Sequence, residues 1–311
     1  MGKSAPSEFS KWMRNNLLAS WKGLITQDID VVIFDDSLSS FILIEEKNSS
    51  KATVRVAQAI CFKMLDEFLN LQNKCKYCGS YLIYYLSDNE IYINPKLKQK
   101  ERKWSYTLDL DGNNLQIDKN ALINLICSNF TGLCKIHKKD WFSFIISNHI
   151  EGLYDCKSSR KSGTHEERSQ WRGSKILNLC NHNRMKNINW IFINYCTGYF
   201  ILIEERCESN GDYKPNPAES KLIDKINDIF YTANNINQSL PDDKKVKNPK
   251  SEVPYEYLGY FLLEFDGEGP ESSNNIYLNH KPISKDKLKE FLNLNSINAK
   301  TIGINYRCKW W

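Results

Sequence analysis

The alternation of apolar and polar residues in the first half of the chain predicts helices and strands in a definite order. Apolar residues spaced by three and four positions indicate helices, and short apolar or alternating runs indicate strands. The run 41–46 is apolar on both faces until its last residues, which is typical of a central strand. The order helix, hairpin, helix, strand predicts an α/β sandwich with a mixed sheet. The expected elements are a helix over 7–21, strands over 30–34 and 41–46, a helix over 51–71, and strands over 81–86 and 90–94.

A second copy of this pattern begins after the middle of the chain. Phe41–Lys47 reads FILIEEK, and Phe200–Arg206, 159 positions later, reads FILIEER. The same offset aligns Trp12 with Trp171, and no gap separates the two matches. Matched segments this far apart, in one register, indicate a tandem duplication.

The duplication predicts two domains, and 311 residues suit two domains of ordinary size. We place the first domain at 1–156 and the second at 164–311, because the stretch between them is polar and carries Ser and Gly. In the second domain we expect a helix over 218–233. A lysine-rich, proline-bearing loop over 239–254 follows it, and we expect this loop to be mobile or to contact nucleic acid.

Three polar side chains at strand ends of the first domain belong together. Asp30 opens one strand of the hairpin, and alternation sends Glu45 and Lys47 to the same face at the end of the next strand. Antiparallel pairing would place the start of the first strand beside the end of the second, so we expect Asp30 to meet Glu45. Two carboxylates and one amine suit hydrolysis of a phosphodiester with Mg²⁺ or Mn²⁺. The alternative is that both acids are solvent-exposed strand ends and that Lys47 pairs with one of them.

This pattern resembles the PD-(D/E)XK nuclease superfamily, which includes restriction endonucleases and archaeal Holliday-junction resolvases. The matching segments are Ile29–Ile33 (IDVVI) and Ile42–Lys47 (ILIEEK). The resemblance implies two tandem restriction-endonuclease-like αβ sandwiches with mixed central sheets. It also implies that Asp30 and Glu45 bind the metal and that Lys47 positions the attacking water.

Two further residues of the first domain are similar to elements of the resolvase-like branch. Gln58 and Phe62 match its Gln-x-x-x-aromatic element, which makes Gln58 a candidate catalytic residue. Glu8, on the expected first helix, is similar in position to an extra metal-ligating acid. The sequence departs from the family pattern where Ile29, not proline, precedes the acid, and Asp28 on the same strand face offers a second acid.

The second copy has lost its strand-opening acid. At the 159 offset, Asp30 becomes Asn189 and Lys47 becomes Arg206. Asparagine is a poor Mg²⁺ ligand because it carries no charge, and arginine binds phosphate better than it positions a water. We therefore expect the second domain to be catalytically dead and to hold DNA. With one active site in each chain, a double-strand break needs a homodimer or a second binding event, whereas a monomer nicks.

Cysteine spacing suggests a structural zinc site in the first domain. Cys75 and Cys78 have the spacing of a zinc knuckle, and Cys134 and His137 offer a second pair with the same spacing. Together they would form a Cys₃His tetrahedron around Zn²⁺. The alternative is that these are ordinary buried thiols, which is common in a chain without a secretion signal.

The charge of the chain permits a polyanionic partner without demanding one. The net charge is +5, and basic residues gather beside Trp104 and Tyr106. Such a cluster fits contact with a phosphate backbone, although a run of charges is more often a solvated face. The residues that we expect to bind nucleic acid are Lys96, Lys98, Lys100, Arg102, Lys103 and Arg206.

The sequence therefore favours a Mg²⁺-dependent DNA endonuclease. The alternatives are a structure-selective, resolvase-like nuclease and a non-catalytic nucleic-acid-binding module that keeps the nuclease fold. RNA is an alternative to DNA as the substrate. The chain has neither an apolar run of about 18 residues nor the apolar region of a signal peptide, so we expect no membrane contact and a cytoplasmic location, or a nuclear one in a eukaryote.

Overall fold

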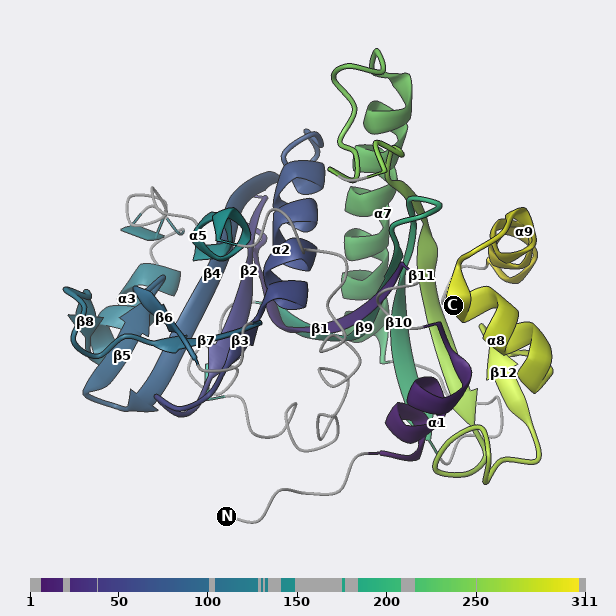
Figure 1. The fold of residues 1–311 in the computed structure, drawn as a ribbon, viewed down its shortest axis with the longest axis horizontal. Coiled ribbons are helices and arrows are strands. Elements are labelled where there is room, and N and C mark those ends of the chain that lie inside the picture. Colours follow the sequence, from purple (N-terminus) through teal and green to yellow (C-terminus); the bar gives the residue numbers. More distant parts are fainter. Residues whose placement is uncertain are drawn as a thin grey trace. The chain divides into compact units, whose positions relative to one another are not determined.

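A computed structural model shows that the described residues form two compact units (Figure 1). Unit 1 contains the described residues of Met1–Asp28 and Ile188–Trp311. Unit 2 contains the described residues of Ile29–Cys156 and Trp171–Asn187. Each unit therefore includes a segment from the other half of the chain, unlike the contiguous domains 1–156 and 164–311. The structure describes residues 7–18, 23–37, 39–100, 104–127, 130, 132–133, 141–148, 175–176, 184–207, 216–249 and 251–307.

Unit 2 is built on a mixed sheet in the order β1-β2-β4-β5-β8. β1 pairs with β2 in antiparallel fashion, β2 with β4 in parallel, and the remaining pairs are antiparallel. A separate small sheet has the order β3-β7-β6. The strands are β1 (Leu24–Asp35), β2 (Ser40–Lys47), β3 (Val54–Arg55), β4 (Lys76–Ser87), β5 (Glu90–Ile93), β6 (Leu97–Gln99), β7 (Ser105–Leu108) and β8 (Gln116–Ile117).

Helices cover both faces of the unit 2 sheet. On one face, α2 (Val56–Leu69) contacts the strands, where the Tyr77 hydroxyl of β4 donates to Asp66 at 2.8 Å. α5 (Trp141–Ser147) packs on α2 through a ring contact between Trp141 and Phe62. On the other face, α3 (Lys119–Cys127) contributes to a core of alternating strand residues. Phe41, Leu43, Glu45 and Lys47 therefore lie on the α2 face, because successive residues of a strand point to opposite faces.

The strands of unit 1 pair in the same order and directions as the first strands of unit 2. β9 (Arg184–Asn194) and β10 (Tyr199–Cys207) are antiparallel, and β10 is parallel to β11 (Glu256–Phe265). β12 (Ile276–Leu278) and β13 (Lys281–Pro282) continue the sheet in antiparallel fashion. The chain is therefore an α/β protein with mixed parallel and antiparallel pairing, as the sequence predicted.

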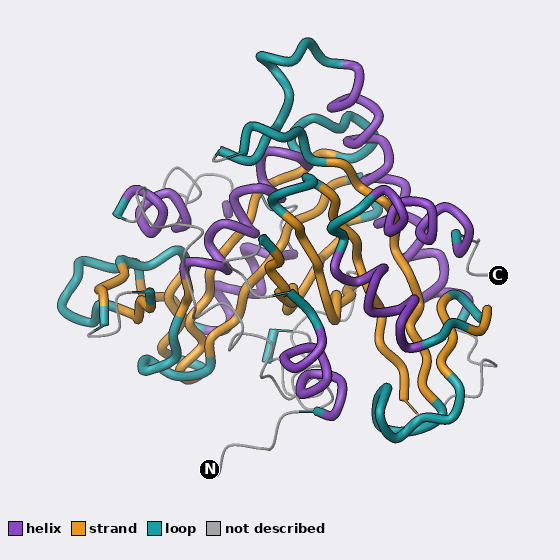
Figure 2. The backbone as a smooth tube through the Cα atoms, turned by 45° about the vertical axis from the view of Figure 1, so that its right-hand side comes forward, coloured by secondary structure: helices purple, strands orange, loops and turns teal. Residues whose placement is uncertain are grey.

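The helices of unit 1 also lie on both sheet faces (Figures 1 and 2). On one face, α7 (Pro217–Ser239) packs its Phe230 ring against Phe200 and Tyr257. A core on the opposite face joins Phe261 and its neighbours to three further helices of the described residues. These helices are α1 (Glu8–Asn16), α8 (Lys285–Asn293) and α9 (Ile297–Tyr306).

Capping residues set where the helices begin. The Ser7 side chain accepts from the backbone N–H of Ser10 at the start of α1, and Asn216 accepts from two N–H groups of α7 ahead of Pro217. The expected helix 51–71 is shorter in the structure, because Val54–Arg55 pair with β7 before α2 begins.

Side-chain hydrogen bonds anchor the loop that follows α7. Asn237 accepts from the backbone N–H of Val246 at 2.7 Å and donates to the carbonyl of Tyr255 at 3.0 Å. These bonds also hold the polar end of α7, which extends to Ser239 and so exceeds the expected 218–233. In the part of the chain that the structure describes, no helix has the length and apolar character needed to span a bilayer.

Candidate active site

The β1–β2 hairpin of unit 2 brings Asp30 beside the end of β2. Val31 pairs with Ile44, so Asp30 lies one residue before this pair and Glu45 one residue after it. The Asp30 Oδ2 atom accepts from the backbone N–H of Glu46 at 2.7 Å. The acid is therefore tied to the strand that carries Glu45 and Lys47.

Glu45 is buried, and its two carboxylate oxygens have different surroundings. Oε1 accepts from the Lys47 ammonium and, at 2.7 Å, from the Gln58 amide. Oε2 is buried and has no hydrogen-bond partner among the described residues. A buried carboxylate oxygen without a partner is costly, and a bound cation is one way to satisfy it.

Lys47 is a charged amine at the centre of this cluster. Burial alone would lower the pKa of Lys47, but the nearby charges of Glu45 and Asp30 oppose burial and raise the pKa above its usual value. The ammonium group therefore stays protonated at neutral pH. Because both acids act on it, the three side chains form one electrostatic group.

The first turn of α2 fixes Gln58 against Glu45. Gln58 is the third residue of the helix, and its Oε1 accepts from the backbone N–H of Arg55 at 3.2 Å. This capping contact orients the amide so that Nε2 points at Glu45. Gln58 is a positioning residue in this arrangement, since its contact is with a carboxylate of the site.

The small sheet braces the loop between Lys47 and α2. The carbonyl of Ala52 accepts from the Tyr84 hydroxyl at 3.0 Å and from Thr107 at 3.2 Å, and Thr107 also donates to the carbonyl of Ser50 at 2.6 Å. Tyr84 pairs with Lys47 across β2 and β4. Burial raises the pKa of Tyr84 to about 12, so its hydroxyl remains a donor. The spacing of the motif residues did not predict these hydrogen bonds.

The donor set of unit 2 fits a hard divalent cation with few protein ligands. Among the residues that the structure describes, no group of three or more His, Cys, Asp or Glu side chains could hold a metal. Asp30 and Glu45 supply two carboxylates, and Mg²⁺ is often held by one or two carboxylates together with waters and substrate phosphates. A cation bound by these two carboxylates would satisfy the buried Glu45 Oε2 atom.

Unit 1 repeats the backbone contact without the acid. The Asn189 Oδ1 atom accepts from the backbone N–H of Glu205 at 2.9 Å, as Asp30 does from Glu46. Glu204 is 1% exposed, like Glu45. The asparagine therefore keeps the structural role of the acid while it loses the charge.

Arg206 in unit 1 contacts two carboxylates. Its Nη2 atom lies 2.7 Å from Glu204 Oε1 and 2.8 Å from Glu219 Oε1. Glu219 is the third residue of α7, which is the position of Gln58 in α2. The sequence reading missed Glu219 because the helix start is displaced from the 159 offset, although counting from the cap Asn216–Pro217 finds it.

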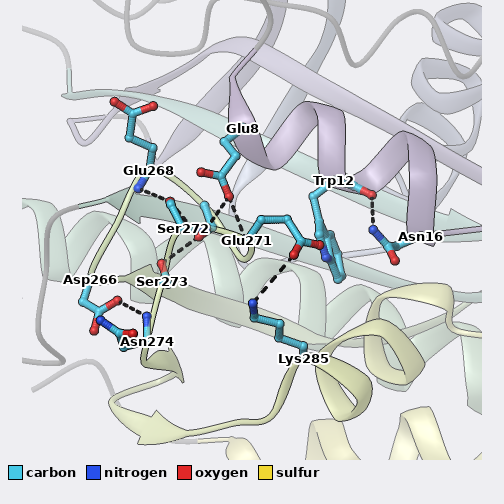
Figure 3. Close-up of polar contacts among 11 residues, drawn as sticks. Glu8, Trp12, Asn16, Asp266, Glu268, Glu271, Ser272, Ser273, Asn274 and Lys285 are labelled. Atoms are coloured by element: carbon cyan, nitrogen blue, oxygen red, sulfur yellow. Dashed lines mark hydrogen bonds and ion pairs between the residues drawn. The ribbon is translucent and has the colours of Figure 1, made fainter.

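Glu8, which the resemblance suggested as a metal ligand, belongs to unit 1, whereas Asp30 and Glu45 belong to unit 2. Figure 3 shows its carboxylate at the loop after β11, where Oε1 accepts from the backbone N–H groups of Glu271 and Ser272 at 2.7 and 2.9 Å. Burial raises the pKa of Glu8, but these bonds outweigh it and lower the pKa below its usual value. The contacts shown for Glu8 stabilise this loop, and its role as a ligand stays a prediction.

The suggested zinc residues fall partly outside the described residues. Cys75 and Cys78 are buried near the start of β4, and Cys78 Sγ lies 3.8 Å from the carbonyl of Lys76. Cys134 and His137 lie outside the residues that the structure describes. The zinc site therefore stays a prediction.

The basic cluster is described only in part. Lys96 and Lys98 are exposed, and Lys98 pairs with Asp109 and Asp111 at 3.4 and 3.3 Å. Lys100 donates to the carbonyl of Lys51 at 2.9 Å. Arg102 and Lys103 lie outside the described residues.

Comparisons with known proteins relate the chain to proteins of one archaeon. The fold and the cluster define an α/β protein with a buried acid–lysine–glutamine group at a strand end. One uncharacterized protein of Archaeoglobus fulgidus is 38% identical over 139 residues, which are 43% of this chain and 88% of that protein. A second uncharacterized protein from the same organism is 39% identical over 95 residues, which are 30% of this chain and 66% of that protein. The chain belongs to the family of the first protein.

The first relative is about as long as the offset between the two similar motifs. A match of 139 residues that covers 88% of it gives a length of about 158 residues, close to the 159-position offset between the two motifs. No family model matches the sequence. No solved structure matches it either.

Proposed function

We propose that the chain is a metal-dependent DNA endonuclease of the PD-(D/E)XK type with one active site, in unit 2. The observation that carries the proposal is the difference between the two carboxylate oxygens of Glu45. Lys47 and Gln58 fix one of its oxygens, and the other is buried beside the aligned Asp30 with no hydrogen-bond partner in the described part of the chain. We further propose that the two units arose by duplication of one restriction-endonuclease-like sandwich.

Each residue of the cluster has a distinct part in the proposed reaction. Asp30 and Glu45 would hold Mg²⁺ or Mn²⁺, which, when bound, polarises a phosphate and lowers the pKa of a bound water. Lys47 keeps its proton and offsets negative charge that develops on the phosphate. Gln58 holds Glu45 in one orientation.

Unit 1 is the non-catalytic copy in this proposal. Asn189 lacks the charge of Asp30, and Arg206 replaces the lysine. A single chain would therefore cut one strand in one binding event. We propose DNA as the partner, bound in part by the exposed Lys96 and Lys98.

Cleavage of supercoiled plasmid with Mg²⁺ or Mn²⁺ tests the proposal. Asp30→Asn copies the residue that unit 1 carries at the same backbone position, so we expect it to fold. It should lower the cleavage rate by about 10³-fold, since a metal site contributes several kcal/mol. The matched control, Asn189→Asp, should leave most of the rate. Equal loss in both variants, or none in Asp30→Asn, contradicts the assignment.

The same assay separates the alternative functions. Preferred cutting of four-way junctions over linear duplex would favour a structure-selective nuclease. Binding of DNA without cleavage by the wild-type chain in either metal would favour a non-catalytic module. A parallel arm with single-stranded RNA tests the alternative substrate.

A further inference from the structure

Two glutamates of unit 1 share one guanidinium nitrogen. Arg206 Nη2 lies 2.7 Å from Glu204 Oε1 and 2.8 Å from Glu219 Oε1. The side chains of Glu204 and Glu219 are 1% and 16% exposed. Charge-assisted hydrogen bonds in this distance range are among the strong ones in proteins, and burial strengthens them.

The second oxygen of Glu204 also has a donor. The Tyr260 hydroxyl lies 3.2 Å from Glu204 Oε2, and burial, helped by the glutamate charge, raises the pKa of Tyr260, so the hydroxyl keeps its proton. In unit 2 the residue at the position of Tyr260 is Ser80, since Leu202 pairs with Tyr260 and Leu43 with Ser80. Serine is short, and its hydroxyl lies 2.6 Å from that of Tyr77. Both oxygens of Glu204 are thus occupied by protein donors.

The two units differ in charge at the helix position, and the cation on the strand differs in shape. Unit 2 places a neutral amide, Gln58, at the third position of the helix and a lysine on the strand. Unit 1 places a carboxylate, Glu219, at that helix position and an arginine on the strand. Two carboxylates facing each other need a cation between them, and the planar guanidinium supplies one.

We propose that Arg206 is a built-in cation that takes the place of a divalent metal ion in unit 1. Its Nη2 atom stands where both carboxylates converge, at distances that exceed the usual Mg²⁺–oxygen distance of about 2.1 Å by roughly 0.6 Å. The site is filled by the chain itself, so unit 1 takes up no metal. This role differs from the phosphate contact that the sequence suggested for Arg206.

Cation rescue of thermal stability tests the proposal in the full chain. All variants carry Asp30→Asn, so the result does not depend on metal binding or catalysis in unit 2. Adding Arg206→Ala leaves Glu204 and Glu219 facing each other and should lower the melting temperature by on the order of 5 °C. Millimolar Mn²⁺ should restore most of this loss, and so should low-millimolar guanidinium. The Asp30→Asn parent, with Arg206 present, should gain little from either cation.

Removal of the two carboxylates provides the control. Adding Glu204→Gln and Glu219→Gln to Arg206→Ala removes the anionic pair, and Mn²⁺ should then restore nothing. If Arg206→Ala is unfolded without metal, its helical circular dichroism signal should return on addition of Mn²⁺. The proposal is overturned if neither cation stabilises Arg206→Ala, or if Mn²⁺ raises the melting temperature of the parent equally. Failure of the nuclease proposal would instead show as plasmid that wild-type protein leaves uncut.

Discussion

At the scale of single residues, Glu45 and Glu204 show that the same short motif can have different surroundings in the two units. Both are buried glutamates at the end of a strand, and both bind the basic residue two positions later. They differ in the second oxygen, which has no hydrogen-bond partner among the residues that the structure describes in Glu45 and accepts from the Tyr260 hydroxyl in Glu204. The surrounding side chains, more than the glutamate itself, therefore separate the proposed metal site from the filled one.

The raised pKa of Lys47 predicts a particular dependence of stability on pH. The pKa of an unfolded lysine is about 10.4, and the pKa of Lys47 in the folded chain is higher. Lys47 therefore contributes its full stabilisation below about pH 10.4 and loses it as the pH rises towards the folded-state pKa. The difference in unfolding free energy between wild type and Lys47→Met should therefore be constant from pH 8 to about 10 and shrink above it. Urea unfolding from pH 8 to 11 measures this difference.

A lysine on α2 provides the comparison for Lys47. Lys63 on α2 pairs with Glu67 one turn later, and its side chain is 32% exposed. Lys63→Met should change the unfolding free energy by about 0.5 kcal/mol or less across the range. A Lys47→Met difference that grows towards pH 11 would contradict the assigned charge state.

At the scale of elements, the hairpin turns of the two units use the same backbone shape with different residues. Ser39 and Gly198, 159 positions apart, both have positive φ, at 48° and 74°. Each carbonyl accepts from the start of the parallel strand, at Lys76 N in unit 2 and Glu256 N in unit 1. Left-handed backbone costs a non-glycine residue about 1 kcal/mol or more, so the serine is strained where the glycine is not.

Exchanging these two turn residues should have opposite effects. Ser39→Gly should stabilise the chain by about 0.5–1 kcal/mol, because it relieves the strained φ. Gly198→Ser should destabilise it by about 2 kcal/mol or more, because a Cβ atom there would lie 2.2 Å from the carbonyl oxygen of Pro254. Urea unfolding at neutral pH measures both. A neutral Gly198→Ser would show that the turn relaxes.

At the scale of the whole molecule, the chain builds each unit from both of its halves. Phe9 of α1 packs on Trp190 and Phe265, and Leu17 joins the same unit 1 core. Ile176, which stands 159 positions after Leu17, is buried in the unit 2 core. Described residues ahead of each hairpin thus lie in the core of the unit that holds the other hairpin.

This exchange predicts where core substitutions in the two segments act. Trp12→Ala, at a cost of about 3–5 kcal/mol, should speed amide hydrogen exchange in β10, β11 and α8. Ile176→Ala, at a cost of about 2–5 kcal/mol, should speed it in β2 and β4 instead. Mass spectrometry of the full-length variants locates the changes. If Trp12→Ala acted first on β2 and β4, the segments would belong to their own halves.

The sequence by itself determined the features that depend on neighbours along the chain. Strand alternation and a tight hairpin suffice to place Asp30 beside Glu45 and Lys47, since the pairing of two adjacent strands is local. The same local pattern predicted the α/β class and the matching hairpin of unit 1. Its motif resemblance also pointed to Gln58, although only the structure shows the amide bonded to Glu45.

Tertiary structure alone decided which distant side chains complete each site. Glu219 and Tyr260 meet Glu204 because α7 and β11 pack against β10, and no periodicity encodes that contact. Likewise, nothing in the amphipathic pattern of α1 tells which hairpin it will cover, because the apolar face of a helix can pack on any apolar sheet face. Local sequence thus set the hairpins and their charged ends. Packing between elements distant in sequence gave Glu204 Oε2 the Tyr260 hydroxyl and left Glu45 Oε2 without a hydrogen-bond partner among the described residues. This difference underlies the chemistry proposed for each unit.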